Sequence, residues 1–250
     1  MAYSGKCFAV TGGASGIGLA TVKLLWSRGA TVCISDVNET GLKKLEHDLQ
    51  ATSVSESQSF STATVDVRIP DQVDAWIAGI VAQYGKLDGA ANVAGAPDAG
   101  GLLAEKSDDD FDFSIGLNLR GVFNCMRAEL KSMGRGASIV NVSSAVICRS
   151  VPGYSLYSAA KSGVNALTKC AAKEYGPVGV RVNSVCPGIT RTPILDVAKL
   201  RPVVQPQIDA TALGRWAEPE EMARTIAFLL SDEASFQSGS VVLVDGGFCC

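Results

Sequence analysis

Short apolar runs alternate along the chain with longer segments whose apolar residues recur at helical spacing. The stretch "KCFAVTGG" is a β-rich run ending in glycines, and "IGLATVKLLWSRG" after it has the spacing of an amphipathic helix with a glycine stop. This pattern predicts strands over residues 6–13, 30–36, 59–67, 87–95, 137–144, 180–188 and 240–247. It predicts helices over residues 17–29, 38–50, 70–85, 111–133, 153–176 and 219–232.

Strands that alternate with helices predict an α/β fold, in which helices cover both faces of a parallel sheet. Right-handed crossovers make this one doubly wound, Rossmann-like sheet of about seven strands. Its ligand crevice lies beyond the carboxyl ends of the strands. We expect a single domain over residues 1–250, in which the irregular segment 190–217 covers the crevice as a lid.

Composition narrows the class of protein. Hydrophobic residues make up 47% of the 250 residues and charged residues 19%, which favours a sizeable core over disorder. The net charge of −3 has no long run of either sign, so no nucleic-acid partner is expected. No apolar run has the length of a membrane span and no signal-peptide pattern precedes Gly12, so we expect a cytoplasmic protein without a membrane partner. His47 is the single histidine, and no metal site is expected.

The segment "TGGASGIG" follows the first predicted strand and opens the first predicted helix. Gly12, Gly16 and Gly18 can bring the backbone close to a pyrophosphate at the helix N-terminus, with Ser15 and Ile17 in the same loop. The spacing is GxxxGxG rather than GxGxxG. Because a tight strand–helix turn without a ligand would look similar, the glycines alone are a weak signal.

Asp36 ends the second predicted strand and strengthens that signal. A carboxylate there would accept hydrogen bonds from the ribose hydroxyls of an adenosine and would repel a 2′-phosphate. The positions where a basic residue could hold such a phosphate carry Ala14, Ser15 and Val37. The sequence therefore predicts NAD rather than NADP; the alternative is a capping Asp with no ligand.

Tyr157 and Lys161 are four residues apart in "YSAAKSG" and share a helix face. A phenol titrates near ~10, but a nearby ammonium and an oxidised nicotinamide favour the phenolate, so Tyr157 could serve as acid or base. Taken alone, such a pair is also typical of an exposed helix. Ser144 ends the preceding strand, where its hydroxyl could bind a substrate oxygen. Spacing alone leaves the role of Asn118 open.

With these motifs the sequence resembles the short-chain dehydrogenase/reductase family, in its compact NAD-type form, from about Lys6 to Gly247. The matching motifs are Thr11-Gly12 through Gly16 and Gly18, Asp66-Val67, Asn92-Val93-Ala94-Gly95, the catalytic set Asn118, Ser144, Tyr157 and Lys161, Pro187-Gly188 through Thr192, and Asp245-Gly246-Gly247. Val93 departs from the family pattern, which has a second Asn there.

The resemblance implies a role for each matched residue. Tyr157 would exchange the proton, Lys161 would bind the nicotinamide ribose and lower the pKa of Tyr157, and Ser144 would hold the substrate oxygen. Asn118 would keep a water that links Lys161 to solvent. Cofactor contacts would come from Gly12, Ser15, Gly16, Ile17, Gly18, Asp36, Asp66, Val67, Asn92, Ala94, Gly95, Tyr157, Lys161, Pro187, Gly188, Ile189 and Thr192. Family members often form tetramers through their two long helices, so we expect a homo-oligomer, a tetramer or a dimer.

The predicted reaction is reversible hydride transfer between NAD and a secondary alcohol or ketone. An apolar lid suggests a bulky hydrophobic substrate, such as a polycyclic or terpenoid alcohol of secondary metabolism, although ordinary packing accounts for it equally well. The apolar lid residues are Ile194, Leu195, Val197, Leu200, Val203 and Val204, and Val146, Ile147 and Tyr154 are expected to face the same space. The alternatives are a cofactor-sensing binding protein on the same fold and a related NAD-dependent dehydratase or isomerase.

Overall fold

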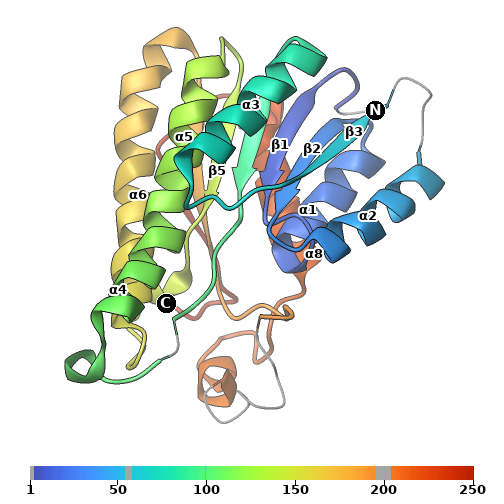
Figure 1. Ribbon diagram of the computed structural model, residues 1–250. Helices are drawn as coiled ribbons and strands as arrows, with labels where there is room; N and C mark the ends of the chain where they lie inside the picture. The colour runs from blue at the N-terminus through green and yellow to red at the C-terminus, as the bar shows by residue number, and fades with distance from the viewer. Residues whose placement is uncertain (1–2, 54–57, 99, 195–203) are drawn as a thin grey trace.

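Seven parallel strands form one sheet at the centre of the protein (Figure 1). The computed structural model describes residues 3–53, 58–98, 100–194 and 204–250. The strands are β1 (Cys7–Thr11), β2 (Thr31–Asp36), β3 (Phe60–Thr64), β4 (Gly89–Asn92), β5 (Ser138–Val142), β6 (Arg181–Pro187) and β7 (Val241–Val244). Their order in the sheet is β3-β2-β1-β4-β5-β6-β7, which confirms the predicted doubly wound topology and places its switch point between β1 and β4.

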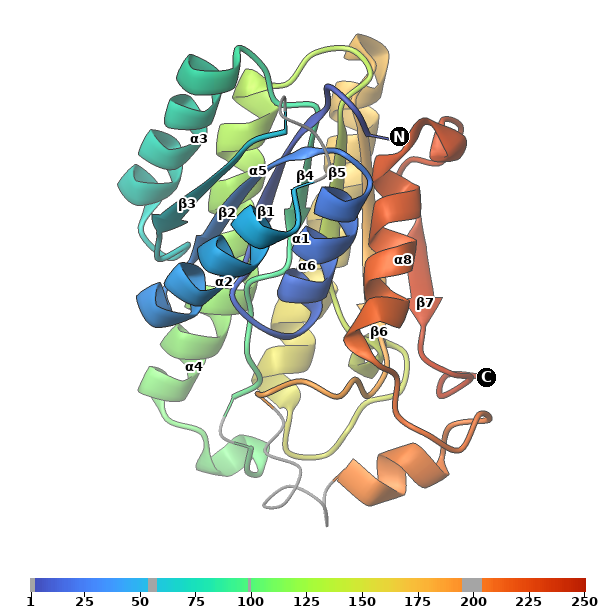
Figure 2. The same cartoon turned by 90° about the vertical axis from the view of Figure 1, so that its right-hand side faces the viewer.

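Helices cover both faces of this sheet (Figures 1 and 2). One face carries α1, α2 and α8, and the other carries α3, α5 and α6. The helices are α1 (Gly16–Ser27), α2 (Glu39–Ala51), α3 (Pro70–Tyr84), α4 (Asp108–Ile115), α5 (Gly121–Ser132), α6 (Ser155–Tyr175) and α8 (Pro219–Leu230). Among the helices of the described residues, none is long and apolar enough to cross a membrane.

Alternate residues of the central strands enter two separate hydrophobic cores. All five residues of β1 are buried. Cys7 and Ala9 belong to the core on the side of α3, α5 and α6, whereas Phe8 and Val10 belong to the core on the side of α1, α2 and α8. A strand buried on both faces needs a continuous apolar run, and this is why "CFAV" shows no polar alternation.

The parallel register brings the strand ends that carry the site to one edge of the sheet. Thr11 at the end of β1 lies beside Ser35 of β2 and Asn92 of β4, and Asn92 in turn lies beside Asn141 of β5. Thr11 also ties two loops together, because its Oγ1 accepts hydrogen bonds from the backbone N–H groups that follow Asn92. The loops that begin here therefore converge on one crevice.

The helix expected over residues 111–133 begins earlier and is interrupted. It starts at Asp108, and a π-helical turn, Gly116–Arg120, separates α4 from α5. Asn118 lies in this turn, and its Nδ2 donates to the carbonyls of Ser114 at 3.1 Å and Ala96 at 2.9 Å. An amide that bonds both to its own helix and to a neighbouring loop accounts for the local widening.

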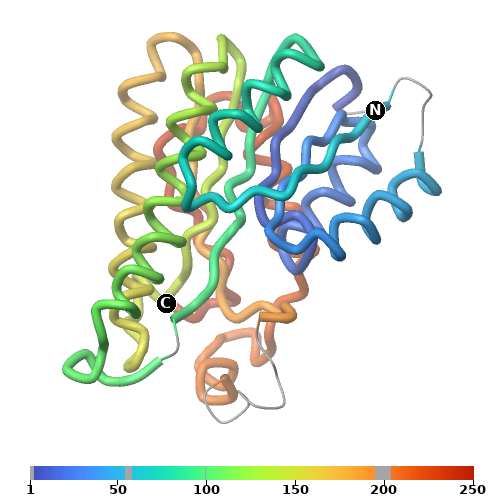
Figure 3. The backbone as a smooth tube through the Cα atoms, in the orientation of Figure 1, coloured from blue at the N-terminus to red at the C-terminus, as the bar shows by residue number. Residues whose placement is uncertain are grey.

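The two ends of the predicted lid, residues 190–217, lie next to each other. Thr190 and Ala217 form an isolated parallel bridge, and Ala217 N donates to Ile189 O at 2.9 Å. Residues 204–209 are helical rather than irregular as predicted. Figure 3 shows this short helix beyond the carboxyl ends of the strands. Four of the predicted lid residues, Leu195, Val197, Leu200 and Val203, lie outside the described residues.

A buried polar cluster joins the sheet to α5 and α6. Asn92 Nδ2 donates to Asn141 Oδ1 and to Glu129 Oε2, both at 3.0 Å, and Asn141 Nδ2 donates to Thr168 Oγ1 at 3.0 Å. Because Glu129 is fully buried, lost hydration raises the pKa of its carboxyl group from an ordinary 4.5 to about 8. The group is therefore mostly protonated at neutral pH.

We expect Glu129→Gln to make the free energy of unfolding less dependent on pH. The folded protein keeps a proton on Glu129 that the unfolded chain releases, so this stabilisation is complete below pH 4.5 and is lost as the pH rises to about 8. The slope is up to ~1.4 kcal/mol per pH unit. Glutamine has no such proton. Denaturant unfolding of both proteins between pH 5 and pH 8 measures the difference, and parallel pH profiles would contradict a buried neutral acid.

Candidate active site

A cavity of about 410 Å³ lies beyond the carboxyl ends of the strands, at the switch point between β1 and β4. Its walls come from the loops after β1 to β6, from α6 and from the segment 190–217. Of the residues predicted for the site, those in its wall are Gly12, Ser15, Gly16, Ile17, Gly18, Asp36, Asp66, Val67, Ala94, Gly95, Ser144, Tyr157, Lys161, Pro187, Gly188, Ile189 and Thr192. Motifs spread over 180 residues of sequence therefore meet at one place.

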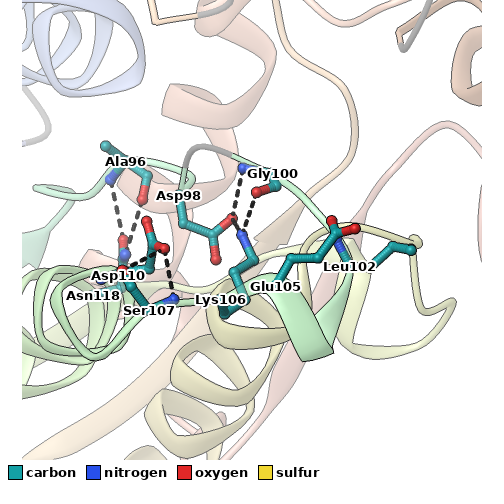
Figure 4. A network of polar contacts seen from close by, with 9 residues as sticks. All are labelled: Ala96, Asp98, Gly100, Leu102, Glu105, Lys106, Ser107, Asp110 and Asn118. Atoms are coloured by element: carbon teal, nitrogen blue, oxygen red, sulfur yellow. Dashed lines mark hydrogen bonds and ion pairs between the residues drawn. The ribbon is translucent and has the colours of Figure 1, made fainter.

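Two predicted site residues, Asn92 and Asn118, are absent from the cavity wall. The Asn92 side chain points into the core, where it binds Asn141 and Glu129. Asn118 instead holds the loop that follows β4. Its Oδ1 accepts from Ala96 N at 3.1 Å and its Nδ2 donates to Ala96 O at 2.9 Å (Figure 4). Both side chains thus lie outside the cavity and hold the elements that form its wall.

The tight packing of the glycine loop requires Gly12 and Gly18. A Cβ on Gly18 would lie 2.0 Å from Gly12 O, and a Cβ on Gly12 would lie 2.9 Å from Ala94 Cα. Within the described chain, Ser15 makes no side-chain cap to α1, and the first turn of α1 has no acidic residue. Free N–H groups and the positive helix end suit a pyrophosphate, so the loop fits a dinucleotide.

Carboxylates stand at the expected adenosine end of the cavity. Asp36 Oδ2 accepts from Ala14 N at 3.0 Å and its Oδ1 accepts from Asn38 N at 2.9 Å, which fixes the carboxylate beside the glycine loop. Asp66 pairs with Arg68, whose Nη2 lies 2.6 Å from Asp66 Oδ2. The hydrogen bond from Arg68 holds the pKa of Asp66 below its ordinary value. Arg68 was not among the predicted site residues.

Tyr157 and Lys161 lie one turn apart on α6, as their spacing predicts. Lys161 Nζ lies 5.7 Å from the centre of the Tyr157 ring and donates to Val142 O at 2.8 Å. The Lys161 side chain is buried, with 2% of the residue exposed. Gly95 packs against it, since a Cβ there would lie 3.1 Å from Lys161 Nζ and 2.8 Å from Asn118 Oδ1. The pair therefore lies inside the cavity wall rather than on an exposed helix face.

Burial shifts both of these groups toward their neutral forms. Lost hydration raises the pKa of Tyr157 to about 12, although a hydrogen bond with Ser144 acts in the opposite direction. Lost hydration also lowers the pKa of Lys161 to about 8. The net shift of the Tyr157 pKa is therefore upward, and the expected lowering of this pKa by Lys161 stays a prediction.

The remaining wall is mostly apolar. Val146 and Tyr154 face the cavity as predicted, as do Ile194 and Val204, whereas Ile147 is not part of the wall. Further lining residues were not predicted because they belong to none of the motifs, among them Ala96, Pro97, Val151, Gln207 and Phe248. Phe248 reaches the cavity because the turn after β7 reverses the chain, and the Arg149 guanidinium lies 5.1 Å from its ring centre. The glycines of "DGG" could have predicted that turn from the sequence.

Comparison with known proteins agrees with this arrangement. The family model described as enoyl-(acyl carrier protein) reductase matches residues 12–249. A protein of Botryotinia fuckeliana, "Short-chain dehydrogenase/reductase aba4", is 43% identical over 256 residues, which cover 99% of this chain and 98% of that protein. The chain belongs to the short-chain dehydrogenase/reductase family. A 2,5-dichloro-2,5-cyclohexadiene-1,4-diol dehydrogenase of Sphingobium indicum is 40% identical over 250 residues, with 98% of this chain and 97% of that protein covered.

Solved structures of the family share the whole architecture. A short chain dehydrogenase from Burkholderia cenocepacia J2315 in complex with NADP superposes with a TM-score of 0.92 over 100% of both chains, at 28% sequence identity. Short-chain dehydrogenases/reductases are oxidoreductases that bind a nicotinamide cofactor. The match and the fold together make this chain an oxidoreductase of that family.

We expect Gly18→Ala to weaken dinucleotide binding by about tenfold or more. The new methyl group would collide with Gly12 O and displace the N–H groups of the loop, and one lost hydrogen bond to a charged group is worth about that factor. Gly79→Ala is the matched control, because a Cβ at Gly79 meets nothing within 4 Å. Calorimetric titration with NAD and NADP measures the effect. Equal affinity of the two variants for dinucleotide would contradict this reading of the loop.

Proposed function

We propose that the protein is an NAD(H)-dependent oxidoreductase that interconverts a secondary alcohol and a ketone. One observation carries this proposal: the hydroxyls of Tyr157 and Ser144 and the buried amine of Lys161 share a cavity with the glycine loop. A dinucleotide laid along that loop would bring its nicotinamide end toward these groups. The same wall thus has residues for cofactor binding and residues for proton exchange.

In alcohol oxidation, Tyr157, Ser144 and Lys161 have separate roles. Bound NAD supplies the hydride acceptor, and the hydroxyl proton has to leave the substrate oxygen at the same time. Tyr157 takes this proton as general base and returns it as general acid in the reverse reaction. Ser144 donates a hydrogen bond to the substrate oxygen while charge develops on it. Lys161 holds the nicotinamide ribose and adds positive charge near the phenol.

The packing around Gly95 supports a role for Asn118 in passing the proton onward from Tyr157. Asn118 and Lys161 both lie against this glycine, so that only a residue without a side chain fits between them. We assign to Asn118 the positioning of a water that passes protons between Lys161 and solvent. Its two hydrogen bonds to Ala96 keep the amide fixed for that purpose.

The choice of NAD over NADP rests on Asp36. Its carboxylate is held at the end of β2 by two backbone N–H groups, where a 2′-phosphate would meet a fixed negative charge. Val37 beside it is 65% exposed and lines the cavity, but it offers no cation to a phosphate. The structural neighbour from Burkholderia cenocepacia binds NADP, so the preference is a property of these residues and not of the fold.

We expect wild-type protein to bind NAD at least about tenfold more tightly than NADP, because like charges at close range cost several kcal/mol. Asp36→Asn/Val37→Arg removes the carboxylate charge and adds a phosphate ligand, so it should reverse the preference. Dissociation constants for both dinucleotides test this. Tighter binding of NADP by the wild-type protein would remove the assigned role of Asp36.

The end of the cavity away from Asp36 suits an apolar, cyclic substrate. Val146, Val151, Val204 and Phe248 line it, and a relative acts on a cyclohexadiene-diol according to its name. We therefore propose a bulky hydrophobic alcohol, of the kind found in secondary metabolism, as the substrate. The bridge between Thr190 and Ala217 closes the base of the segment 190–217, which supports its assignment as a lid on a single catalytic domain.

Exposed aromatic residues on the helix that includes α4 and α5, namely Phe111, Phe113 and Phe123, support a homo-oligomer formed through this helix. The tetramer and the cytoplasmic location stay predictions.

The alternatives of a silent cofactor sensor and of a dehydratase or isomerase are less favoured, because the proton-exchanging groups are assembled around one cofactor-sized cavity.

We expect Tyr157→Phe to lose at least about a hundredfold in kcat while it still binds NAD, because the variant lacks the group that exchanges the proton. Tyr84→Phe is the control: Tyr84 lies at the end of α3, away from the cavity. NADH formation with a panel of cyclic secondary alcohols gives kcat, and calorimetry gives NAD affinity. Turnover of Tyr157→Phe at the wild-type rate would reject the mechanism, and an absence of turnover by the wild type would favour a sensor.

A further inference from the structure

Two cysteines from distant parts of the chain lie next to each other beside the cavity. Cys148 follows a short 3₁₀ helix, Ala145–Ile147, and Cys249 follows the turn after β7. The carbonyl oxygen of Ala145 accepts a hydrogen bond from Cys148 N at 3.0 Å and another from Cys249 Sγ at 3.4 Å. Figure 2 shows the C-terminus just beyond the carboxyl end of β7. One carbonyl oxygen thus joins the Cys249 thiol to the backbone of Cys148.

Contacts of the adjacent residues keep these two segments side by side. Arg149 Nη1 donates to Phe248 O at 3.4 Å, and the Arg149 guanidinium lies 5.1 Å from the centre of the Phe248 ring. Asp245 Oδ2 accepts from Cys249 N at 3.0 Å, which holds the turn after β7 in place. Burial, the Asp245 carboxylate and the Cys148 thiol all raise the pKa of Cys249. The two thiols are therefore close enough to interact.

Access from solvent distinguishes this pair from another close pair of thiols. Cys7 Sγ lies 3.8 Å from Cys33 Sγ, but these residues are only 2% and 0% exposed. Cys148 is exposed and Cys249 is partly exposed. A thiol reacts with a dissolved disulfide only where the two sulfurs can meet. Cys148 and Cys249 therefore combine proximity with access, which Cys7 and Cys33 do not.

The turn that carries Cys249 can adjust to a covalent bond. A disulfide requires sulfur atoms about 2.05 Å apart, so the two thiols have to approach each other. Gly246 and Gly247 form this turn with φ of 64° and 79°, and glycine has no Cβ to restrict its torsions. Phe248, between these glycines and Cys249, lines the cavity, as does Val146 of the 3₁₀ helix. A bond between the sulfurs therefore acts on two parts of the cavity wall.

We propose that Cys148 and Cys249 form a reversible disulfide, which draws Phe248 toward Val146 and narrows this end of the cavity. The oxidant is a small disulfide of the class of oxidised glutathione. Formation of the bond is independent of the proposed function, whereas its effect on substrates rests on the proposed alcohol dehydrogenase activity.

The reaction proceeds through two thiol–disulfide exchanges. Cys148 reacts first, because the raised pKa of Cys249 keeps that thiol protonated. The Cys148 thiolate attacks one sulfur of oxidised glutathione, which breaks the glutathione disulfide and releases one glutathione. Cys249 then loses its proton to water and attacks the Cys148 sulfur of the mixed disulfide, which releases the second glutathione. The two cysteines lose two electrons and two protons, and one oxidised glutathione becomes two reduced ones.

Peptide mapping after oxidation tests the site in the native protein. We would incubate the protein with oxidised glutathione, alkylate the remaining thiols and identify linked peptides by mass spectrometry. The variants are Cys148→Ser and Cys249→Ser. Cys250→Ser is the matched control, because Cys250 is the exposed neighbour and its Sγ donates to Gly247 O at 3.1 Å. Cys170→Ser controls for an exposed cysteine of α6.

We expect a peptide that links Cys148 to Cys249 in the wild type and in both controls, and its loss after reduction with dithiothreitol. Cys148→Ser should form no such link. Cys249→Ser should instead retain glutathione on Cys148, because the second exchange has no thiol to carry it out.

The effect on the cavity is measured with a bulky and a small alcohol. In the oxidised wild type, the ratio of kcat/KM for 1-decalol to that for cyclohexanol should fall about tenfold, the usual cost of a pocket too small for part of a substrate. Affinity for NAD should stay within about threefold, because the glycine loop is not part of the cross-linked segments. Dithiothreitol should restore the ratio, and oxidant should leave it unchanged in Cys148→Ser.

Three results would contradict parts of this account. Absence of the linked peptide from the native wild type, or its loss in Cys250→Ser, would overturn the assignment of the disulfide to Cys148 and Cys249. An unchanged ratio after complete cross-linking would overturn the narrowing of the cavity. Failure of the reduced wild type to oxidise either alcohol would refute the proposed function and its substrate effect, while the linked peptide would still decide the disulfide.

Discussion

Burial of a phenol and an amine in one cavity wall is the constraint on which the site depends. Water stabilises phenolate and ammonium, and the structure shields Lys161 from it almost completely and Tyr157 in part. In the protein alone, lost hydration raises the pKa of the Tyr157 phenol and lowers the pKa of the Lys161 amine. The balance can change when another positive charge enters the same low-dielectric space, where charges interact more strongly than in water. Under the proposed function, the positive charge of bound NAD would favour the phenolate form of Tyr157.

The sheet makes this burial possible. Parallel strands place their carboxyl ends in register, so that the loops after β1, β4, β5 and β6 line one cavity. Lys161 is anchored to that edge through Val142, the last residue of β5. Behind it, the cluster of Asn92, Asn141 and Glu129 ties β4 and β5 to α5. The helix that carries Lys161 and the strands β4 and β5 are thus anchored to one another.

Much of this arrangement follows from the sequence, for physical reasons. The strands of a doubly wound sheet are continuous apolar runs, and Tyr157 and Lys161 share a face through helical spacing alone. Other features depend on contacts between distant segments. Asp98 and Lys106 look like ordinary surface charges in "PDAGGLLAEKS", and only the folded loop buries them. The π-turn at Asn118 needs the loop at Ala96, and Phe248 reaches the cavity through a turn whose direction no motif gives. The direction of the pKa shift at Tyr157 likewise depends on burial, which spacing does not measure.

Under the proposed function, bound oxidised cofactor, and not Lys161 alone, makes the Tyr157 hydroxyl acidic. Ultraviolet difference titration of phenolate, with Tyr157→Phe subtracted from wild type, reports this one group in the free protein and in the NAD complex. We expect a pKa of about 12 without cofactor and a value lower by two units or more, about a hundredfold in acidity, with NAD bound. The same titration midpoint in both states would contradict the account.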